Sequence, residues 1–94
     1  MNQQKIARTL NIVAKEFGTK PEAFFRKPRV LNHNMAAYNA AIYFLRIHNQ
    51  YIPRHLAAIF KKSESSFTKQ IPIVKGWQPG TKNHQRIQTI KSRL

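Results

Sequence analysis

Residues 34–48 read Asn-Met-Ala-Ala-Tyr-Asn-Ala-Ala-Ile-Tyr-Phe-Leu-Arg-Ile-His, and this stretch decides the fold. Tyr38, Ile42 and Leu45 follow one another at steps of four and three residues, which is the spacing of one face of an α-helix. Apolar residues also stand beside that face, so we expect this helix to be mostly buried. A buried helix needs other elements around it, and the rest of the chain shows what these are.

The residues before this stretch predict two helices. Residues 3–17 carry apolar side chains at helical spacing, and Gly18 then supplies a left-handed stop. A short helix is expected over 20–26, where Thr19 begins a capping-box pattern and Pro28 ends the segment. The short helix would bury Ala23 and either Phe24 or Phe25.

The residues after this stretch predict three more helices. One should cover about 53–60, and the next should begin at about 64. Pro72 removes an amide donor and should end or kink that second helix. The breaker cluster 76–80 precedes a last amphipathic helix, and β-branched alternation typical of strands is absent. We therefore expect an all-α fold, a small helical bundle of about five to six helices containing a helix-turn-helix. Residues 1–75 would form the helix-turn-helix domain, and 76–94 the Gly/Pro break and basic C-terminal helix.

The charge of the chain points to a polyanionic partner. Its 94 residues include 17 Lys and Arg but only three acids, Glu16, Glu22 and Glu64, which gives a net charge of +14. Self-repulsion of this size opposes compaction, so a polyanion would stabilise the fold. Nucleic acid is the leading partner, and an anionic membrane surface or an acidic protein are the alternatives.

The same composition argues against catalysis and metal binding. The chain has no Asp and no Cys, and its acids are few. Carboxylate-pair hydrolysis, oxygen-ligated cation sites and thiolate zinc sites all need residues that are scarce or missing here. We expect no enzyme activity, no cofactor and no metal, and the four histidines are interpreted as structural or solvated.

Targeting segments do not explain the charge. The first 30 residues lack the apolar run of about 7–15 residues found in a signal peptide. No stretch approaches the roughly 20 apolar residues of a membrane span. We expect no membrane insertion and, by elimination, a cytoplasmic, nucleoid-associated location.

The two helices expected over roughly 53–71 have the size of a helix-turn-helix. In that motif the second helix enters the major groove, where hydroxyls and a carboxylate can meet base edges and lysines can neutralise phosphates. The predicted DNA-binding residues are Arg26, Lys27, Arg29, His33, Lys61, Lys62, Ser63, Glu64, Ser65, Ser66, Thr68 and Lys69. The alternative is that Ser63 merely caps a helix and that Lys61 and Lys62 form a solvated turn.

The run 13–25, Val-Ala-Lys-Glu-Phe-Gly-Thr-Lys-Pro-Glu-Ala-Phe-Phe, resembles the opening of the C-terminal DNA-binding domain of DnaA, the bacterial replication initiator. In that family a Lys/Arg-rich loop follows, matched here by 26–29, and then a long helix. A helix-turn-helix then begins near a proline, matched by Pro53, and its first helix ends in a phenylalanine, matched by Phe60. The resemblance covers roughly residues 5–75 and implies a free-standing relative with the Trp-repressor-like fold and DNA binding.

The chain departs from that family where sequence would be read. The family signature Asp-His-Thr-Thr-Val falls on residues 64–68, which are Glu-Ser-Ser-Phe-Thr here. The family also inserts an arginine into the minor groove, whereas the matching stretch 31–34 contains none. Because readout depends on the donors and acceptors of each side chain, the sequence recognised should differ from the initiator's usual box.

The sequence therefore predicts a double-stranded DNA-binding protein that uses a helix-turn-helix and a basic loop, with a role in replication or transcription control. A phage or mobile-element origin, a homodimer and a host protein partner stay open. The alternatives are a structural RNA or ribosome-associated protein, and an adaptor for an acidic host protein.

The roles of Trp77 and of residues 81–94 each have two interpretations. Trp77 either stacks on a base or packs on the core edge, and residues 81–94 either bind phosphates or pack as a helix.

Overall fold

The computed structural model describes residues 3–25 and 32–94, and for residues 32–34 it describes the backbone only. Every regular element in this part of the chain is helical, which confirms the all-α fold. The five α-helices and two 3-10 helices are α1 (Gln3–Glu16), η1 (Pro21–Phe25), α2 (Asn32–Ile47), α3 (Pro53–Phe60), η2 (Glu64–Phe67), α4 (Gln70–Lys75) and α5 (Lys82–Arg93).

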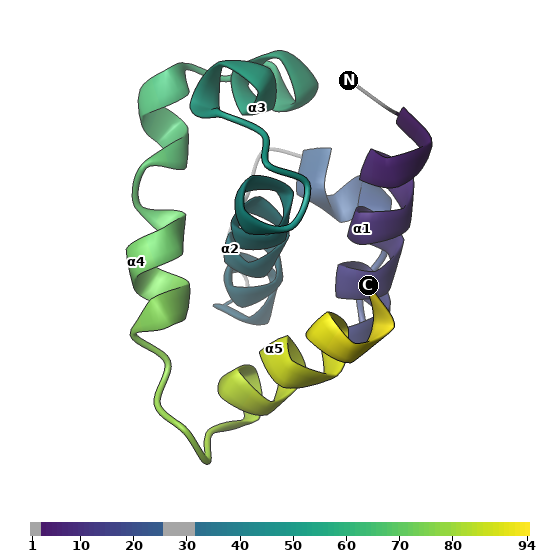
Figure 1. Ribbon diagram of the computed structural model, residues 1–94, viewed down its shortest axis with the longest axis vertical. Coiled ribbons are helices and arrows are strands. Elements are labelled where there is room, and N and C mark those ends of the chain that lie inside the picture. Colours follow the sequence, from purple (N-terminus) through teal and green to yellow (C-terminus); the bar gives the residue numbers. More distant parts are fainter. Residues whose placement is uncertain (1–2, 26–31) are drawn as a thin grey trace.

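Helix α2 lies at the centre of the molecule, and the other elements surround it (Figure 1). It packs against α1 on one side and against α4 on the other. Its residues Ala40–Leu45 are all buried, so this part of the helix is apolar on every side. The stretch that predicted the fold is therefore the core of the fold.

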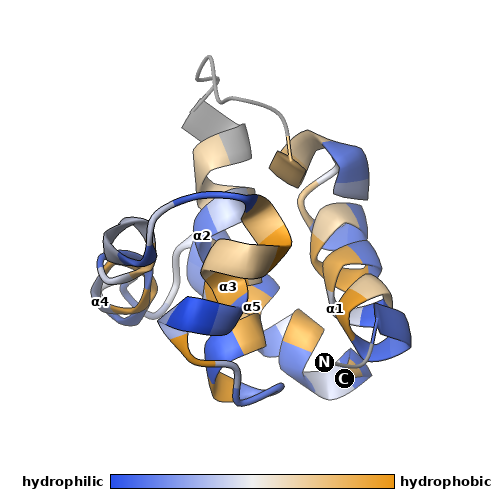
Figure 2. Cartoon of the chain, turned by 90° about the horizontal axis from the view of Figure 1, so that it is seen from above, coloured by the Kyte–Doolittle hydropathy of each residue, from blue (hydrophilic) through white to orange (hydrophobic). Residues whose placement is uncertain are grey.

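Helices α1 and α5 form the side of the molecule opposite α4 (Figure 1). The apolar stripe of α1 is buried as predicted, and Gly18 ends the segment with a φ of +70°. In Figure 2 the hydrophobic residues of α1 lie on the side turned toward the other helices. Ile87 and Ile90 of α5 are buried in the same core, so the C-terminal helix packs on the rest of the chain.

The segment expected as a helix over 20–26 is instead the 3-10 helix η1. Its five residues bury Phe24, while Phe25 keeps 51% of its surface exposed and stacks on Phe60 with ring centroids 5.1 Å apart. One buried side chain is enough to hold a segment this short between two longer helices. Burying that side chain does not require a regular α-helix, so the tighter 3-10 form suffices.

The helix expected from about 64 is interrupted, and the interruption lies before Pro72. It consists of η2, a bend at Thr68 and Lys69, and then α4, in which Pro72 is the third residue. In an uninterrupted helix the Pro72 ring would clash with the carbonyl of Thr68, four residues earlier. Backbone N–H groups in the first turn of a helix have no carbonyl partner within that helix. A proline there therefore removes no hydrogen bond. Pro72 therefore displaces the break toward the N-terminus and does not end the helix.

Candidate nucleic-acid interface

The turn after α3 has a defined geometry. Lys61 ends α3 in the left-handed conformation with a φ of +54°. The amide of Lys62 then donates a hydrogen bond of 3.2 Å to the carbonyl of Ala57, which closes the last turn of the helix. The left-handed region costs a residue with a side chain about 1–2 kcal/mol. The Lys61 side chain is exposed beyond this turn.

Three serines form a hydroxyl cluster at the start of η2. The Ser63 hydroxyl lies 3.1 Å from the Ser65 hydroxyl and 3.1 Å from the Ser66 hydroxyl. Ser63 and Ser65 are exposed, and Ser66 is half-buried. Because each hydroxyl can both donate and accept, the cluster can offer either role to a polar group outside the protein.

Side chains also complete the bend between η2 and α4. The Thr68 hydroxyl donates to the Ser65 carbonyl at 3.1 Å, and the Gln70 amide nitrogen Nε2 donates to the Ser66 carbonyl at 2.6 Å. In a continuous helix these two carbonyls would accept from backbone amides four residues later. The two side chains replace those bonds, so the bend keeps its carbonyls satisfied.

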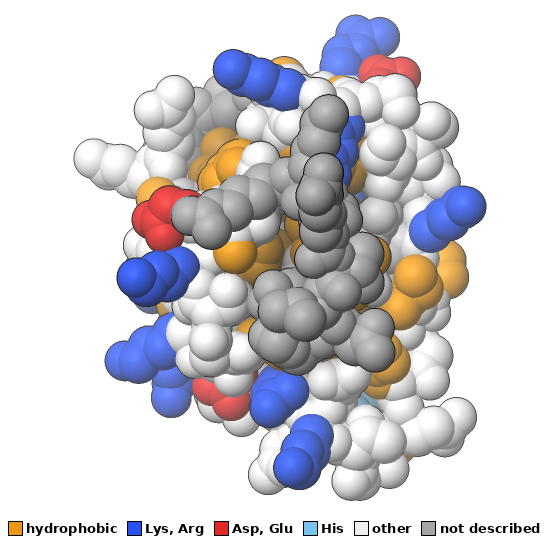
Figure 3. All heavy atoms as spheres, turned by 180° about the vertical axis from the view of Figure 1, so that it is seen from behind, with side chains coloured by type: hydrophobic (Ala, Val, Ile, Leu, Met, Phe, Trp, Pro, Cys, Tyr) orange, Lys and Arg blue, Asp and Glu red, His pale blue; other side chains and the backbone are white. Residues whose placement is uncertain are grey.

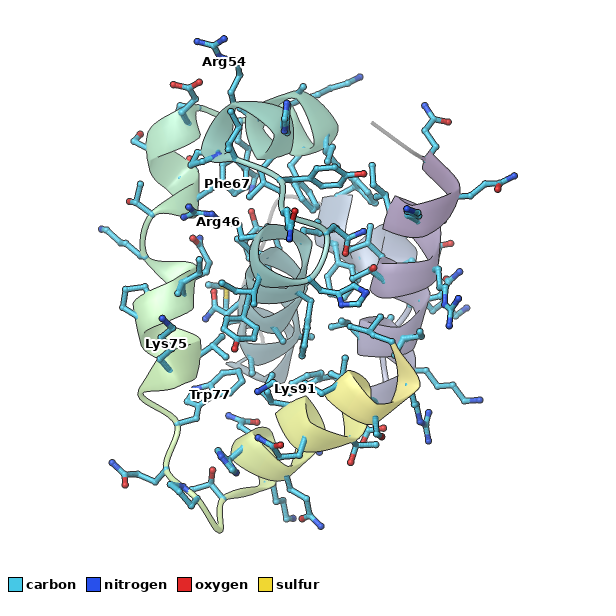
Figure 4. All side chains as sticks on the ribbon, in the orientation of Figure 1. Arg46, Arg54, Phe67, Lys75, Trp77 and Lys91 are labelled. Atoms are coloured by element: carbon cyan, nitrogen blue, oxygen red, sulfur yellow. The ribbon has the colours of Figure 1, made fainter. Side chains whose placement is uncertain are left out.

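Phe67 attaches this segment to the core. Its side chain is fully buried, and its ring centroid lies 5.8 Å from that of Phe60 at the end of α3. Phe60 in turn meets the edge of Tyr38 on α2, with ring centroids 5.8 Å apart. In Figure 4 Phe67 points from η2 toward the interior, beneath α3. This chain of rings fixes η2 relative to α3 and leaves its polar residues outside.

Glu64 forms an ion pair across the turn. Its Oε1 atom lies 3.6 Å from Nε of Arg54, which belongs to the first turn of α3. Both side chains are largely exposed, at 58% for Glu64 and 82% for Arg54. The carboxylate therefore has a cationic partner and still keeps free surface for a further hydrogen bond.

Lys62 lies over the ring of Tyr38, with its ammonium nitrogen 4.8 Å from the ring centroid. A cation in this position is attracted to the ring by about 0.5–1 kcal/mol near the surface. The Tyr38 hydroxyl is buried and has no hydrogen-bond partner among the described residues. Burial raises the pKa of the Tyr38 phenol above its ordinary value.

The predicted residues of the turn and of the second element follow one another along residues 61–69, and most of them are exposed. Six of them are exposed there: Lys61, Ser63, Glu64, Ser65, Thr68 and Lys69. Lys62 and Ser66 are half-buried, Lys62 against Tyr38 and Ser66 within the hydroxyl cluster. Arg26, Lys27 and Arg29 lie outside the described residues. His33 belongs to the first turn of α2 by its backbone, and its side chain is not among those described.

Arg54 is a residue beside this segment that the sequence interpretation missed. It stands on the α3 side of the turn and faces outward in Figure 4. The signal that could have found it is the scarcity of acids, because Glu64 is the only acidic side chain after Glu22 and attracts the cations near it. Arg46 of α2 lies on the side of α4 in Figure 4 and is half-buried.

Cations also lie elsewhere on the molecule. On the rear face in Figure 3, several Lys and Arg side chains gather at the lower left, and others stand singly around the edge. Two ion pairs join side chains of the described residues, Arg54 with Glu64 and Arg93 with Glu16, the second at 3.9 Å. Most of the positive charge of the described residues is therefore uncompensated by carboxylates.

In the described part of the chain, no three His, Asp or Glu side chains gather in a way that could hold a metal ion. None of the helices there is long and apolar enough to cross a membrane. No family profile matches the chain, and no curated protein or solved structure is significantly similar to it.

Proposed function

We propose that this protein binds double-stranded DNA, with α3 and the η2–α4 segment acting as a helix-turn-helix. The observation that carries the proposal is the exposed edge of η2. The hydroxyl cluster that includes Ser63 and the Arg54–Glu64 ion pair both lie at this edge, in a chain of net charge +14. Hydroxyls, a carboxylate and a guanidinium are the groups that read base edges in the major groove. The resemblance of residues 5–75 to the DnaA domain supports the proposal, because it would assign DNA contact to the same segment.

The roles divide by chemistry. Lys61 and Lys69 flank the edge and would neutralise phosphates, which sets affinity and orientation without reading sequence. Ser65 and Glu64 would meet base edges, where a carboxylate accepts from a cytosine amino group. Arg54 would hold the Glu64 carboxylate and weaken its repulsion by neighbouring phosphates. A binding role of this kind uses no catalytic group and no cofactor.

Selection of bound duplexes from a random pool at near-physiological salt tests the proposal. Enrichment of a sequence motif is expected, and Ser65→Ala should flatten that preference more than it lowers overall affinity. Ser92→Ala is the matched control, since Ser92 is an exposed serine of α5. A pool that shows no retention of duplex DNA would overturn the proposal.

The same assay tests the two alternative partners, structured RNA and an acidic protein. Structured RNA added as competitor should displace little duplex DNA if the proposal holds. Clear preference for the RNA would assign the protein to RNA binding. Weak retention of both nucleic acids, together with a tight acidic protein partner, would favour an adaptor.

The biological setting is a further part of the proposal. A sequence-specific duplex binder can act by occupying a site, which suits control of replication or transcription in the nucleoid. Mapping the selected motif onto a bacterial or phage genome would show whether it lies at an origin or at a promoter.

A further inference from the structure

A small cavity of about 240 Å³ lies at the other end of α4, between the chain after Lys75 and the helix α5. Trp77 lines it together with Lys75 from α4 and Lys91 from α5. In Figure 4 these three side chains lie on one side of the molecule, with Trp77 between the end of α4 and α5. His84 and Gln88 of α5 contribute further polar groups.

The inner wall of this cavity is apolar and firmly supported. Val74 and Ile87 line it and are both buried in the core. Trp77 is half-buried, and its ring lies 6.4 Å from that of Phe17. The core thus holds one part of the indole in place, while the remainder faces the cavity. A fixed aromatic ring beside open space can receive a second flat ring.

The charges at the mouth of the cavity are all positive. Lys75 and Lys91 are exposed, and the ammonium group of neither forms a hydrogen bond or ion pair within 3–25 and 32–94. None of the three glutamates lines the cavity. Two unpaired ammonium groups beside a tryptophan suit a ligand that is both flat and anionic.

We propose that this cavity binds one unpaired nucleotide of single-stranded DNA, with the base against Trp77 and the flanking phosphates on Lys75 and Lys91. Base–aromatic stacking together with a cationic groove is the general way in which proteins hold single strands without base pairing. His84 and Gln88 can form hydrogen bonds to the edge of the base. The site goes beyond duplex binding and does not depend on it.

The chain offers a direct probe, because Trp77 is its only tryptophan. Titration of the full chain with a short oligothymidylate should quench the indole fluorescence in a saturable way. The double variant Lys75→Gln, Lys91→Gln should weaken this binding about tenfold or more. The matched control Lys15→Gln, Lys82→Gln removes the same charge from exposed sites outside the cavity and should weaken it much less.

Inorganic polyphosphate separates stacking from simple charge attraction. It carries the charge without bases, so it should bind but leave the indole fluorescence nearly unchanged. Quenching by polyphosphate equal to that by the oligonucleotide would overturn the proposal, and so would equal losses in the two double variants.

Trp77→Phe and Trp77→Ala, measured with a dye-labelled oligonucleotide, test the aromatic contact independently. Phenylalanine should retain most of the affinity, whereas alanine should lose about fivefold or more. Where Trp77→Ala fails to fold, the lysine variants decide the outcome. Single-strand quenching without duplex retention would leave this site standing and refute only the duplex interface, and the reverse result would refute only this site.

Discussion

Arg54 and Glu64 join the first turn of α3 to the first residue of η2 through an ion pair of 3.6 Å. Both side chains are mostly exposed, so the pair contributes at most about 1 kcal/mol to stability. Its larger effect is on the position of the carboxylate. The pair favours the Glu64 conformations that lie near Arg54 and partly offsets the negative charge of the carboxylate.

Glu64→Gln should change DNA binding more than it changes the fold. Removing the carboxylate removes a repulsion with phosphates, so affinity for unrelated duplexes should rise about two- to fivefold. Discrimination among sequences should fall at the same time, because one carboxylate oxygen is replaced by an NH2 donor and the remaining acceptor for base amino groups is neutral. Fluorescence anisotropy with selected and scrambled duplexes measures both effects. Unchanged discrimination would limit Glu64 to holding Arg54.

Lys61→Gln and Lys69→Gln should each reduce the salt dependence of duplex binding. If each lysine neutralises one phosphate, the slope of log K against log salt should become less steep by about 0.9 per substitution. Lys15→Gln in α1 is the control and should leave the slope unchanged. Binding isotherms at several salt concentrations give the slopes, and identical slopes for all variants would refute the assignment.

Phe67→Ala should destabilise the protein by about 3–5 kcal/mol, because it empties a fully buried site between α3 and the core. Phe25→Ala removes the same side chain from a position that is 51% exposed, and it should cost far less. Urea unfolding followed by circular dichroism measures both changes. Similar losses in the two variants would contradict the buried position of Phe67.

Tyr38→Phe should alter the stability of the protein at high pH. The pKa of the buried phenol is raised, so folding favours its neutral form. This contribution is complete below the unfolded-state pKa of about 10 and is lost as the pH rises through the folded-state pKa. Phenylalanine does not ionise, so the stability of the variant does not depend on this group. The variant should therefore become more stable relative to the original chain as the pH rises above about 10.

At neutral pH the same variant should be as stable as the original chain or up to about 1 kcal/mol more stable, because it removes a buried hydroxyl that has no hydrogen-bond partner in 3–25 and 32–94. Urea unfolding at neutral and alkaline pH gives the difference at each pH. A difference that does not vary with pH would show that the phenol is not protected from ionisation by the fold.

Much of the fold could be predicted from the sequence because its signals are local. The first helix was expected over 3–17 and occupies Gln3–Glu16, and the helix expected over 53–60 occupies Pro53–Phe60. In both cases a regular apolar stripe and a clear terminal signal, Gly18 or Pro53, agree with each other. Where two local signals agree on a helix boundary, tertiary packing rarely shifts it.

The break before α4 could not be located in this way. Pro72 indicated an interruption, but whether it falls before or after the proline depends on which carbonyls find other donors. Thr68 and Gln70 supply those donors by hydrogen bonds to the residues of η2. The Arg54–Glu64 pair was missed for a related reason, since it spans two elements whose relative placement follows from the packing of Phe60 and Phe67.

The packing of α5 against α1 has a consequence for the order of folding. The two helices lie at opposite ends of the described chain, and their contacts include a hydrogen bond of 3.5 Å from Arg8 to the carbonyl of Arg93, 85 residues later. During synthesis α1 leaves the ribosome first, yet it acquires its full set of neighbours only when α5 arrives. Until then part of its apolar stripe stays open to water, so a nascent chain halted before α5 is a species that chaperones would retain.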